Sequence, residues 1–128
     1  MEKNKDWGLL LMRVVLGVLF IAHGWPKVTG IENTIGFFGT LGLPAALAYA
    51  VAGVEVLGGA AMILGLWTKW AGYALAVDMV GAIYFVKWTR GLIANNGGYG
   101  YELALLALAL GVALIGPGLF TAKKFIKM

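Results

Sequence analysis

The chain has 128 residues, of which 61% are hydrophobic and only 12% charged, and its mean hydropathy is +0.86. Soluble domains carry about 25% charged residues, so this composition excludes an ordinary soluble domain and predicts a membrane protein. The chain has no cysteine, which excludes disulfides and Cys-ligated clusters within it and leaves the redox compartment unreadable. Its net charge of +4 comes without a basic, aromatic-rich stripe, which argues against a nucleic-acid partner.

Four apolar runs are predicted as membrane-spanning helices, because each approaches the roughly 20 residues that a bilayer core requires. They lie within one membrane domain, 1–128, at residues 7–25, 45–67, 69–88 and 100–116. Tryptophan prefers the headgroup level, and all five tryptophans fall at expected helix ends: Trp7, Trp25, Trp67, Trp70 and Trp88. The predicted fold is all-α, a polytopic membrane protein built as a four-transmembrane-helix bundle.

The segment 27–43 connects the first two spans and has a pattern of its own. Its apolar residues recur at steps of four, three and three positions: Ile31, Ile35, Phe38 and Leu41. This spacing is typical of one helical face. We therefore expect a short interfacial helix between spans 1 and 2, lying on the outer side of the membrane.

The orientation is predicted from the basic residues that flank the spans, since these accumulate on the cytoplasmic side. One side carries six: Lys3, Lys5, Lys69, Lys123, Lys124 and Lys127. The other side carries three: Lys27, Lys87 and Arg90. We expect a multi-pass protein of the cell membrane with both termini in the cytoplasm.

Each apolar run is interrupted by ionisable residues, which cost at least about 2.5–3.5 kcal/mol near the centre of a bilayer. At 100° per residue these positions share a helical face with small residues, the composition of close helix contacts in membranes. They are therefore expected to face the bundle interior. The residues concerned are Arg13, His23, Glu55, Asp78 and Glu102.

A rise of about 1.5 Å per residue sorts these side chains into two clusters by depth. The inner cluster is a buried charge network of Arg13, Glu55 and Asp78, in which Arg13 is predicted to pair with Glu55. The outer cluster is a candidate ligand site of His23, Lys27 and Glu102. There the first helix is expected to end at Pro26, and His23 with Glu102 is expected to close a polar pocket toward the outer leaflet.

Several spaced motifs of the chain resemble those of the DoxX family of four-helix membrane proteins. After Arg13 they are "HGWPK" (23–27), "FFGTLGLP" (37–44), "EVLGGAAMILG" (55–65), "ELALL" (102–106) and "GPG" (116–118). The family takes its name from a membrane subunit of an archaeal thiosulfate:quinone oxidoreductase, and other members are associated with redox or thiol-stress systems. Five residues match motif positions of the family: Arg13, His23, Lys27, Glu55 and Glu102. Asp78 does not match such a position.

The residues and the resemblance together favour a redox-associated membrane subunit that binds a quinone-like or other lipophilic molecule between its helices. A single histidine and no cysteine predict no metal site and no covalently bound cofactor, and no residue is assigned a catalytic role. Two alternatives stay open: a membrane scaffold that docks soluble oxidoreductases, and a small transporter or proton path. The expected partners are the lipid bilayer and a soluble or membrane oxidoreductase subunit, with a homo-oligomer left open.

Overall fold

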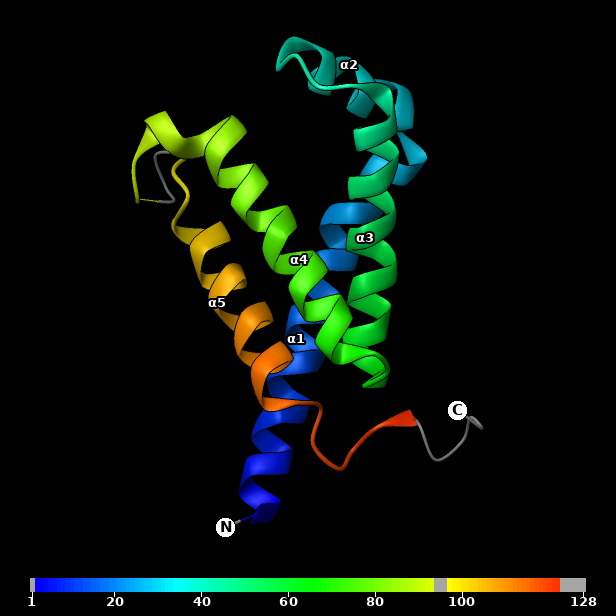
Figure 1. Cartoon of the computed structure of the whole chain (residues 1–128), viewed down its shortest axis with the longest axis vertical. Helices are drawn as coiled ribbons and strands as arrows, with labels where there is room; N and C mark the ends of the chain where they lie inside the picture. Colours follow the sequence, from blue (N-terminus) through cyan, green and yellow to red (C-terminus); the bar gives the residue numbers. More distant parts are fainter. Residues whose placement is uncertain (1, 94–96, 123–128) are drawn as a thin grey trace.

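A computed structural model describes residues 2–93 and 97–122 of the chain, and every regular element in these ranges is helical. The all-α prediction is therefore confirmed. The elements in chain order are α1 (Glu2–Thr29), α2 (Ile31–Thr40), α3 (Ala45–Leu64), α4 (Thr68–Ala82), a π-helical turn η1 (Ile83–Lys87), a 3-10 turn η2 (Trp88–Arg90) and α5 (Gly100–Ile115) (Figure 1).

Each predicted span contains one long helix, but the helices differ in length. Within the described residues, Lys3–Thr29 and Ala45–Leu64 are long and apolar enough to cross a membrane, whereas α5 is apolar but has 16 residues. Regular α-helix in α4 ends at Ala82, where the chain widens into the π-helical turn η1. Crossing of the bilayer by all four segments thus stays a prediction.

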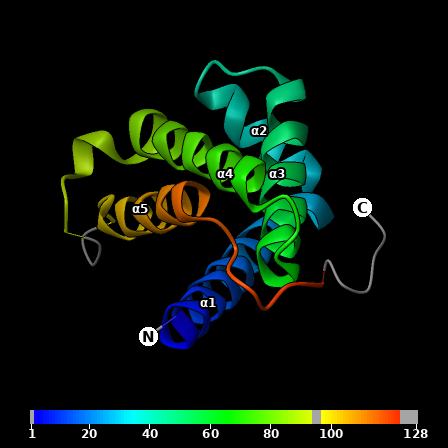
Figure 2. The ribbon, with the colours of Figure 1, turned by 60° about the horizontal axis from the view of Figure 1, so that its bottom comes forward.

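The four long helices pack as two pairs, α1 with α3 and α4 with α5, and α3 also packs against α4 (Figures 1 and 2). Figure 1 shows the two pairs spreading apart toward the end that carries α2. Between α1 and α3 the backbones approach so closely that a Cβ on Gly17 would collide with the carbonyl of Gly59. A Cβ on Gly24 would lie 2.7 Å from the Cβ of Glu55. Glycine is thus used here for helix contact, as small residues are in membrane bundles.

The first helix does not end at Pro26, so that part of the prediction is wrong. Proline removes the hydrogen bond to the carbonyl four residues earlier, yet the chain stays helical to Thr29. The carbonyl of Pro26 accepts a bond of 2.8 Å from the backbone N–H of Gly30. The hydroxyl of Thr29 donates to the carbonyl of Trp25 at 3.1 Å. The turn after proline therefore has its own hydrogen bonds, and α1 carries Lys27 on its last turn.

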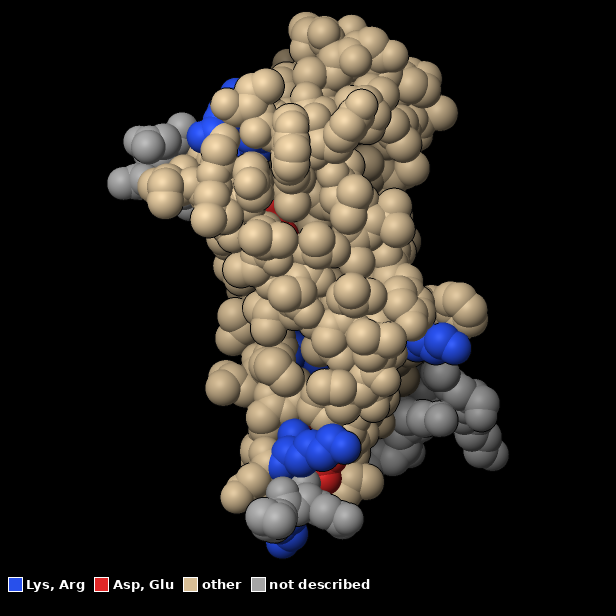
Figure 3. Space-filling view, turned by 60° about the vertical axis from the view of Figure 1, so that its left-hand side comes forward, with Lys and Arg blue, Asp and Glu red and all other residues tan. Residues whose placement is uncertain are grey.

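The short helix expected in 27–43 is present as α2, which bridges α1 and α3 and has no buried residue. The hydroxyl of Thr34 donates to the carbonyls of Lys27 and Gly30, each at 3.3 Å. These bonds fix the start of α2 to the end of α1. Figure 3 shows a face that is mainly uncharged between its two ends, as expected for contact with lipid.

Candidate functional site

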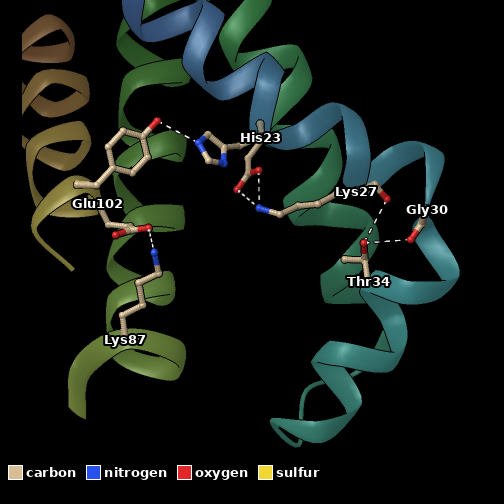
Figure 4. Close-up of polar contacts among 8 residues, drawn as sticks. His23, Lys27, Gly30, Thr34, Lys87 and Glu102 are labelled. Carbon is tan, nitrogen blue, oxygen red and sulfur yellow. Dashed lines mark hydrogen bonds and ion pairs between the residues drawn. The ribbon is translucent and has the colours of Figure 1, made fainter. Parts of the chain in front are cut away.

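A two-oxygen ion pair joins α1 and α3 at the end of the molecule that carries α2. The Lys27 ammonium lies 2.6 Å from Oε1 and 2.9 Å from Oε2 of Glu55. The Glu55 side chain is 2% exposed and that of Lys27 is 33% exposed. Figure 4 shows the Lys27 nitrogen at two dashed lines, which are these two contacts. The most deeply buried carboxylate at this end is thus neutralised by a residue that was predicted for the outer cluster.

Asp78 on α4 lies near this pair. Its side chain is within hydrogen-bonding reach of Glu55 and interacts electrostatically with Lys27. Its atom Oδ2 is buried and has no hydrogen-bond donor among the described residues. Lys27, Glu55 and Asp78 therefore form one group contributed by α1, α3 and α4.

The predicted contact between His23 and Glu102 is replaced by two neighbouring contacts. Nε2 of His23 is hydrogen-bonded at 3.0 Å to the hydroxyl of Tyr101, and the two rings lie 5.4 Å apart. Glu102 accepts a hydrogen bond of 2.6 Å from the Lys87 ammonium of η1. Figure 4 shows the dashed line of the His23 bond and Lys87 reaching Glu102. Tyr101 thus occupies the place beside His23 that Glu102 was predicted to take.

These polar groups surround one small cavity, here called the polar cavity. It has a volume of about 70 Å³. It is lined by Phe20, His23, Lys27, Glu55, Met79, Ala82, Tyr101, Glu102 and Leu105. The structure therefore brings all three residues of the predicted outer cluster to one cavity and adds Glu55 and Tyr101 to them.

A larger depression adjoins the polar cavity beneath α2, and we call it the outer groove. It measures about 480 Å³ and shares His23, Lys27 and Ala82 with the polar cavity. Its remaining lining comes from α1, α2 and η1: Ala22, Pro26, Gly30, Asn33, Thr34, Phe37, Phe38 and Val86. A molecule in this groove would have mainly apolar walls and three nitrogen-bearing side chains, those of His23, Lys27 and Asn33.

Arg13 does not pair with Glu55, so the predicted inner pair is wrong. Its guanidinium donates instead to four backbone carbonyls: Met62 at 2.9 Å, Ile63 at 3.2 Å, Pro117 at 2.6 Å and Phe120 at 2.8 Å. Arg13 is 1% exposed and sits where α3 ends and the segment after α5 crosses beneath it. The inner charge network is thus two separate features, the Arg13 contacts and the group around Glu55.

Two residues of the site were missed by the sequence interpretation, Tyr101 and Lys87. Tyr101 precedes Glu102 in the chain, and its ring contacts His23. Lys87 had been treated only as a flanking charge. Tyrosine beside a buried carboxylate was the available signal, whereas the reach of Lys87 depends on η1, which the spacing does not reveal. Within the described residues, no group of three or more His, Cys, Asp or Glu side chains is arranged to hold a metal.

The long apolar helices, their glycine contacts and the buried charges together define a helical membrane protein with a polar site between its helices. The DoxX family model matches residues 8–88. The chain belongs to the DoxX family, which confirms the resemblance of its motifs.

Two relatives span nearly the whole chain. "Putative oxidoreductase CatD" of Bacillus subtilis is 36% identical over 129 residues, covering 97% of this chain and 96% of the relative. "Inner membrane protein YqjF" of Escherichia coli is 27% identical over 131 residues, covering 98% and 97%. No solved structure matches the chain significantly.

Proposed function

We propose that this DoxX protein is a redox-associated membrane subunit that binds a quinone-like molecule in the outer groove, with its polar head directed to the polar cavity. The observation that carries the proposal is the junction of the two spaces at His23 and Lys27. One homologue is named as an oxidoreductase, which supports a redox association. The inner-membrane names of other relatives support the cell membrane as its location.

The size of the two spaces decides where the ring would lie. Ligand pockets typically measure about 300–1,000 Å³, so the polar cavity at about 70 Å³ is too small for a substituted ring. At about 30 Å³ per water, it holds roughly two water molecules. The outer groove, at about 480 Å³, is large enough. The ring therefore belongs in the groove, with water or a ring oxygen reaching into the polar cavity.

The chemistry of the lining residues suits a quinone head, whose carbonyl oxygens accept hydrogen bonds. The Lys27 ammonium has three N–H donors, and its two contacts with Glu55 do not use all of them. The imidazole of His23 has a second ring nitrogen besides the one that is bonded to Tyr101. A hydrogen bond contributes about 1 kcal/mol net, or roughly fivefold in affinity. This protein would position and bind the ring, while electrons would come from an oxidoreductase partner.

A photoreactive azido-quinone with a short tail tests the proposal on the full chain in nanodiscs. We expect saturable labelling of α1 and α2 that an unlabelled quinone displaces. Ala22→Trp, which fills the outer groove, should abolish the labelling. The control Val18→Trp, one turn away on the same helix at a position 52% exposed, should leave it intact. Labelling that does not saturate, or that both variants retain, would overturn the proposal.

A further inference from the structure

A depression lies where α3 turns into α4, at the end of the molecule away from α2 (Figure 1), and we call it the α3–α4 depression. It measures about 410 Å³ and is lined by residues 65–70 together with part of the segment after α5. This volume is in the range of ligand pockets, about 300–1,000 Å³. The α3–α4 depression shares no lining residue with the polar cavity or the outer groove, so the proposed function leaves it without a role.

The first turn of α4 leaves backbone donors without an acceptor in the helix. Its first hydrogen bond runs from the N–H of Ala71 to the carbonyl of Trp67 at 2.9 Å, so the N–H groups of residues 68–70 have no helical partner. Trp67 precedes the helix with φ 51° and ψ 35° and makes no side-chain cap. A non-glycine residue in this left-handed region is strained, and such strain is concentrated at functional sites. Unpaired N–H groups at a helix start favour an anion.

The side chain of Thr68 independently indicates a missing partner. Thr68 is 3% exposed and lines the α3–α4 depression. Its hydroxyl is hydrogen-bonded to no residue in the described part of the chain, and it is not among the unpartnered atoms there that are fully enclosed. Buried hydroxyl groups normally have a hydrogen-bond partner. The Thr68 hydroxyl is therefore a donor that a bound molecule can reach.

A buried guanidinium lies directly behind the wall of this depression. A Cβ on Gly65 would lie 2.8 Å from Nη2 of Arg13, and Nη1 donates to the carbonyl of Pro117 at 2.6 Å; Gly65 and Pro117 both line the depression. Arg13 belongs to neither ion pair of the described residues. The carboxylate of Asp6 lies at the same end, where its Oδ1 accepts the N–H of Leu119 at 3.1 Å. It balances at most one cation.

Lys69 supplies a second cation, in the wall of the depression itself. Its ammonium lies 5.1 Å from the ring centroid of Trp70. Trp67 and Trp70 flank it in the chain and are 63% and 67% exposed. Exposed indoles prefer the headgroup level of a membrane. The positive charge of this depression is therefore placed where the phosphates of lipids lie.

We propose that the α3–α4 depression binds the phosphate of an anionic phospholipid, held by the Lys69 ammonium, the Thr68 hydroxyl and the first backbone N–H groups of α4. Basic pockets at the ends of membrane helices bind anionic headgroups in this way. The two exposed indoles favour a lipid over free phosphate as the source of the anion, because they hold the site at the bilayer surface. This site lies at the opposite end of the molecule from the outer groove and goes beyond the proposed function.

Photoreactive phosphatidylglycerol and phosphatidylcholine with the same acyl chains make a matched pair of probes. Both contain the phosphodiester, but phosphatidylcholine also carries a compensating ammonium. Each is added at the same low mole fraction to nanodiscs that hold the full chain in phosphatidylcholine, and the labelling of residues 65–70 is compared. We expect phosphatidylglycerol to label at least about fivefold more, the effect of one basic residue near the surface. Equal labelling by the two lipids would overturn the proposal.

An excess of unlabelled phosphatidylglycerol should displace the label, whereas inorganic phosphate should not. Displacement by inorganic phosphate would overturn the lipid as the source of the anion. Lys69→Met should lower the labelling ratio about fivefold. Thr68→Val, which replaces the hydroxyl by a methyl group, should lower it roughly twofold to fivefold.

Lys5→Met is the matched control, because it removes an exposed charge from the same end of the molecule outside the depression. It should leave the labelling ratio unchanged. Equal loss in Lys5→Met and Lys69→Met would overturn the proposal, because the attraction would then be diffuse. All three variants should retain azido-quinone labelling of the outer groove, so failure of one site is distinguishable from failure of the other.

Discussion

Lys27 and Glu55 form a bridge between α1 and α3 in which one ammonium contacts both oxygens of one carboxylate, at 2.6 and 2.9 Å. The bridge is asymmetric, since the Glu55 side chain is almost fully buried and the Lys27 side chain is one-third exposed. A long side chain that is partly exposed can move its charge toward the surface. A buried carboxylate on a short side chain has no such freedom.

This asymmetry predicts that Lys27→Met destabilises the protein more than Glu55→Gln does. Breaking a buried pair costs about 3–5 kcal/mol, and we expect about 3 kcal/mol for Lys27→Met because one partner is partly exposed. Glu55→Gln should cost less, and the double variant should recover much of the loss. Unfolding in detergent by a denaturant titration measures the three free energies. Equal losses in the two single variants would contradict the prediction.

The contacts of Arg13 predict independence from Glu55. Arg13→Met should destabilise the protein strongly, because four carbonyls lose a donor. The Met62 carbonyl keeps a bond from the backbone N–H of Gly65, whereas each buried acceptor left unsatisfied costs about 1–3 kcal/mol. Combined with Glu55→Gln, the two losses should add within about 0.5 kcal/mol, as for separate sites. A coupling free energy above about 1 kcal/mol would contradict this and indicate the direct Arg13–Glu55 pair that was predicted from the sequence.

The glycine contacts predict opposite effects of alanine at two positions. Gly24→Ala should cost about 1–3 kcal/mol, because the new methyl group would press against Glu55 and Val56. Gly53→Ala should be neutral or stabilise by about 0.5–1 kcal/mol, because it fills open space on α3 and restricts the unfolded chain. Thermal unfolding of both variants in the same detergent checks the sign of each change.

The predicted orientation is testable with single cysteines, because the native chain has none. Asn33→Cys on α2 should react with a membrane-impermeant maleimide in intact cells. Lys69→Cys, at the start of α4, should react only after permeabilisation. Both positions are exposed, so a lack of reaction cannot be due to burial within this chain. Labelling of Lys69→Cys in intact cells would reverse the topology.

The helical fold, the short helix after the first span and the gathering of His23, Lys27 and Glu102 at one site were accessible from the sequence, because hydrophobic runs and buried charges carry that information. The partners of the charges were not. The depth estimate placed Glu55 level with Leu16, whereas Glu55 packs against Gly24. Eight residues correspond to about 12 Å along a helix. Because of this offset, Glu55 lies away from Arg13 and contacts Lys27 instead.

The offset has a physical cause in the unequal helices. α1 continues through Pro26 to Thr29 at one end, while α3 already ends at Leu64. Helices of unequal length need not be aligned at their midpoints. Two residues that lie equally far from the ends of their own helices can therefore lie at different depths in the membrane. The π-helical turn that brings Lys87 to Glu102 is likewise invisible to a count based on 3.6 residues per turn.

The position of Arg13 also orders the events of biosynthesis. Two of its four carbonyl acceptors lie 104 and 107 residues further along the chain, which at about 5–20 residues per second takes roughly 5–20 s to synthesise. During that interval the first helix carries a guanidinium that its final partners have not yet reached. The contacts of Arg13 are therefore completed only after the last helix and the segment that follows it, and a nascent chain released before Pro117 would keep an arginine that lacks two of its four acceptors.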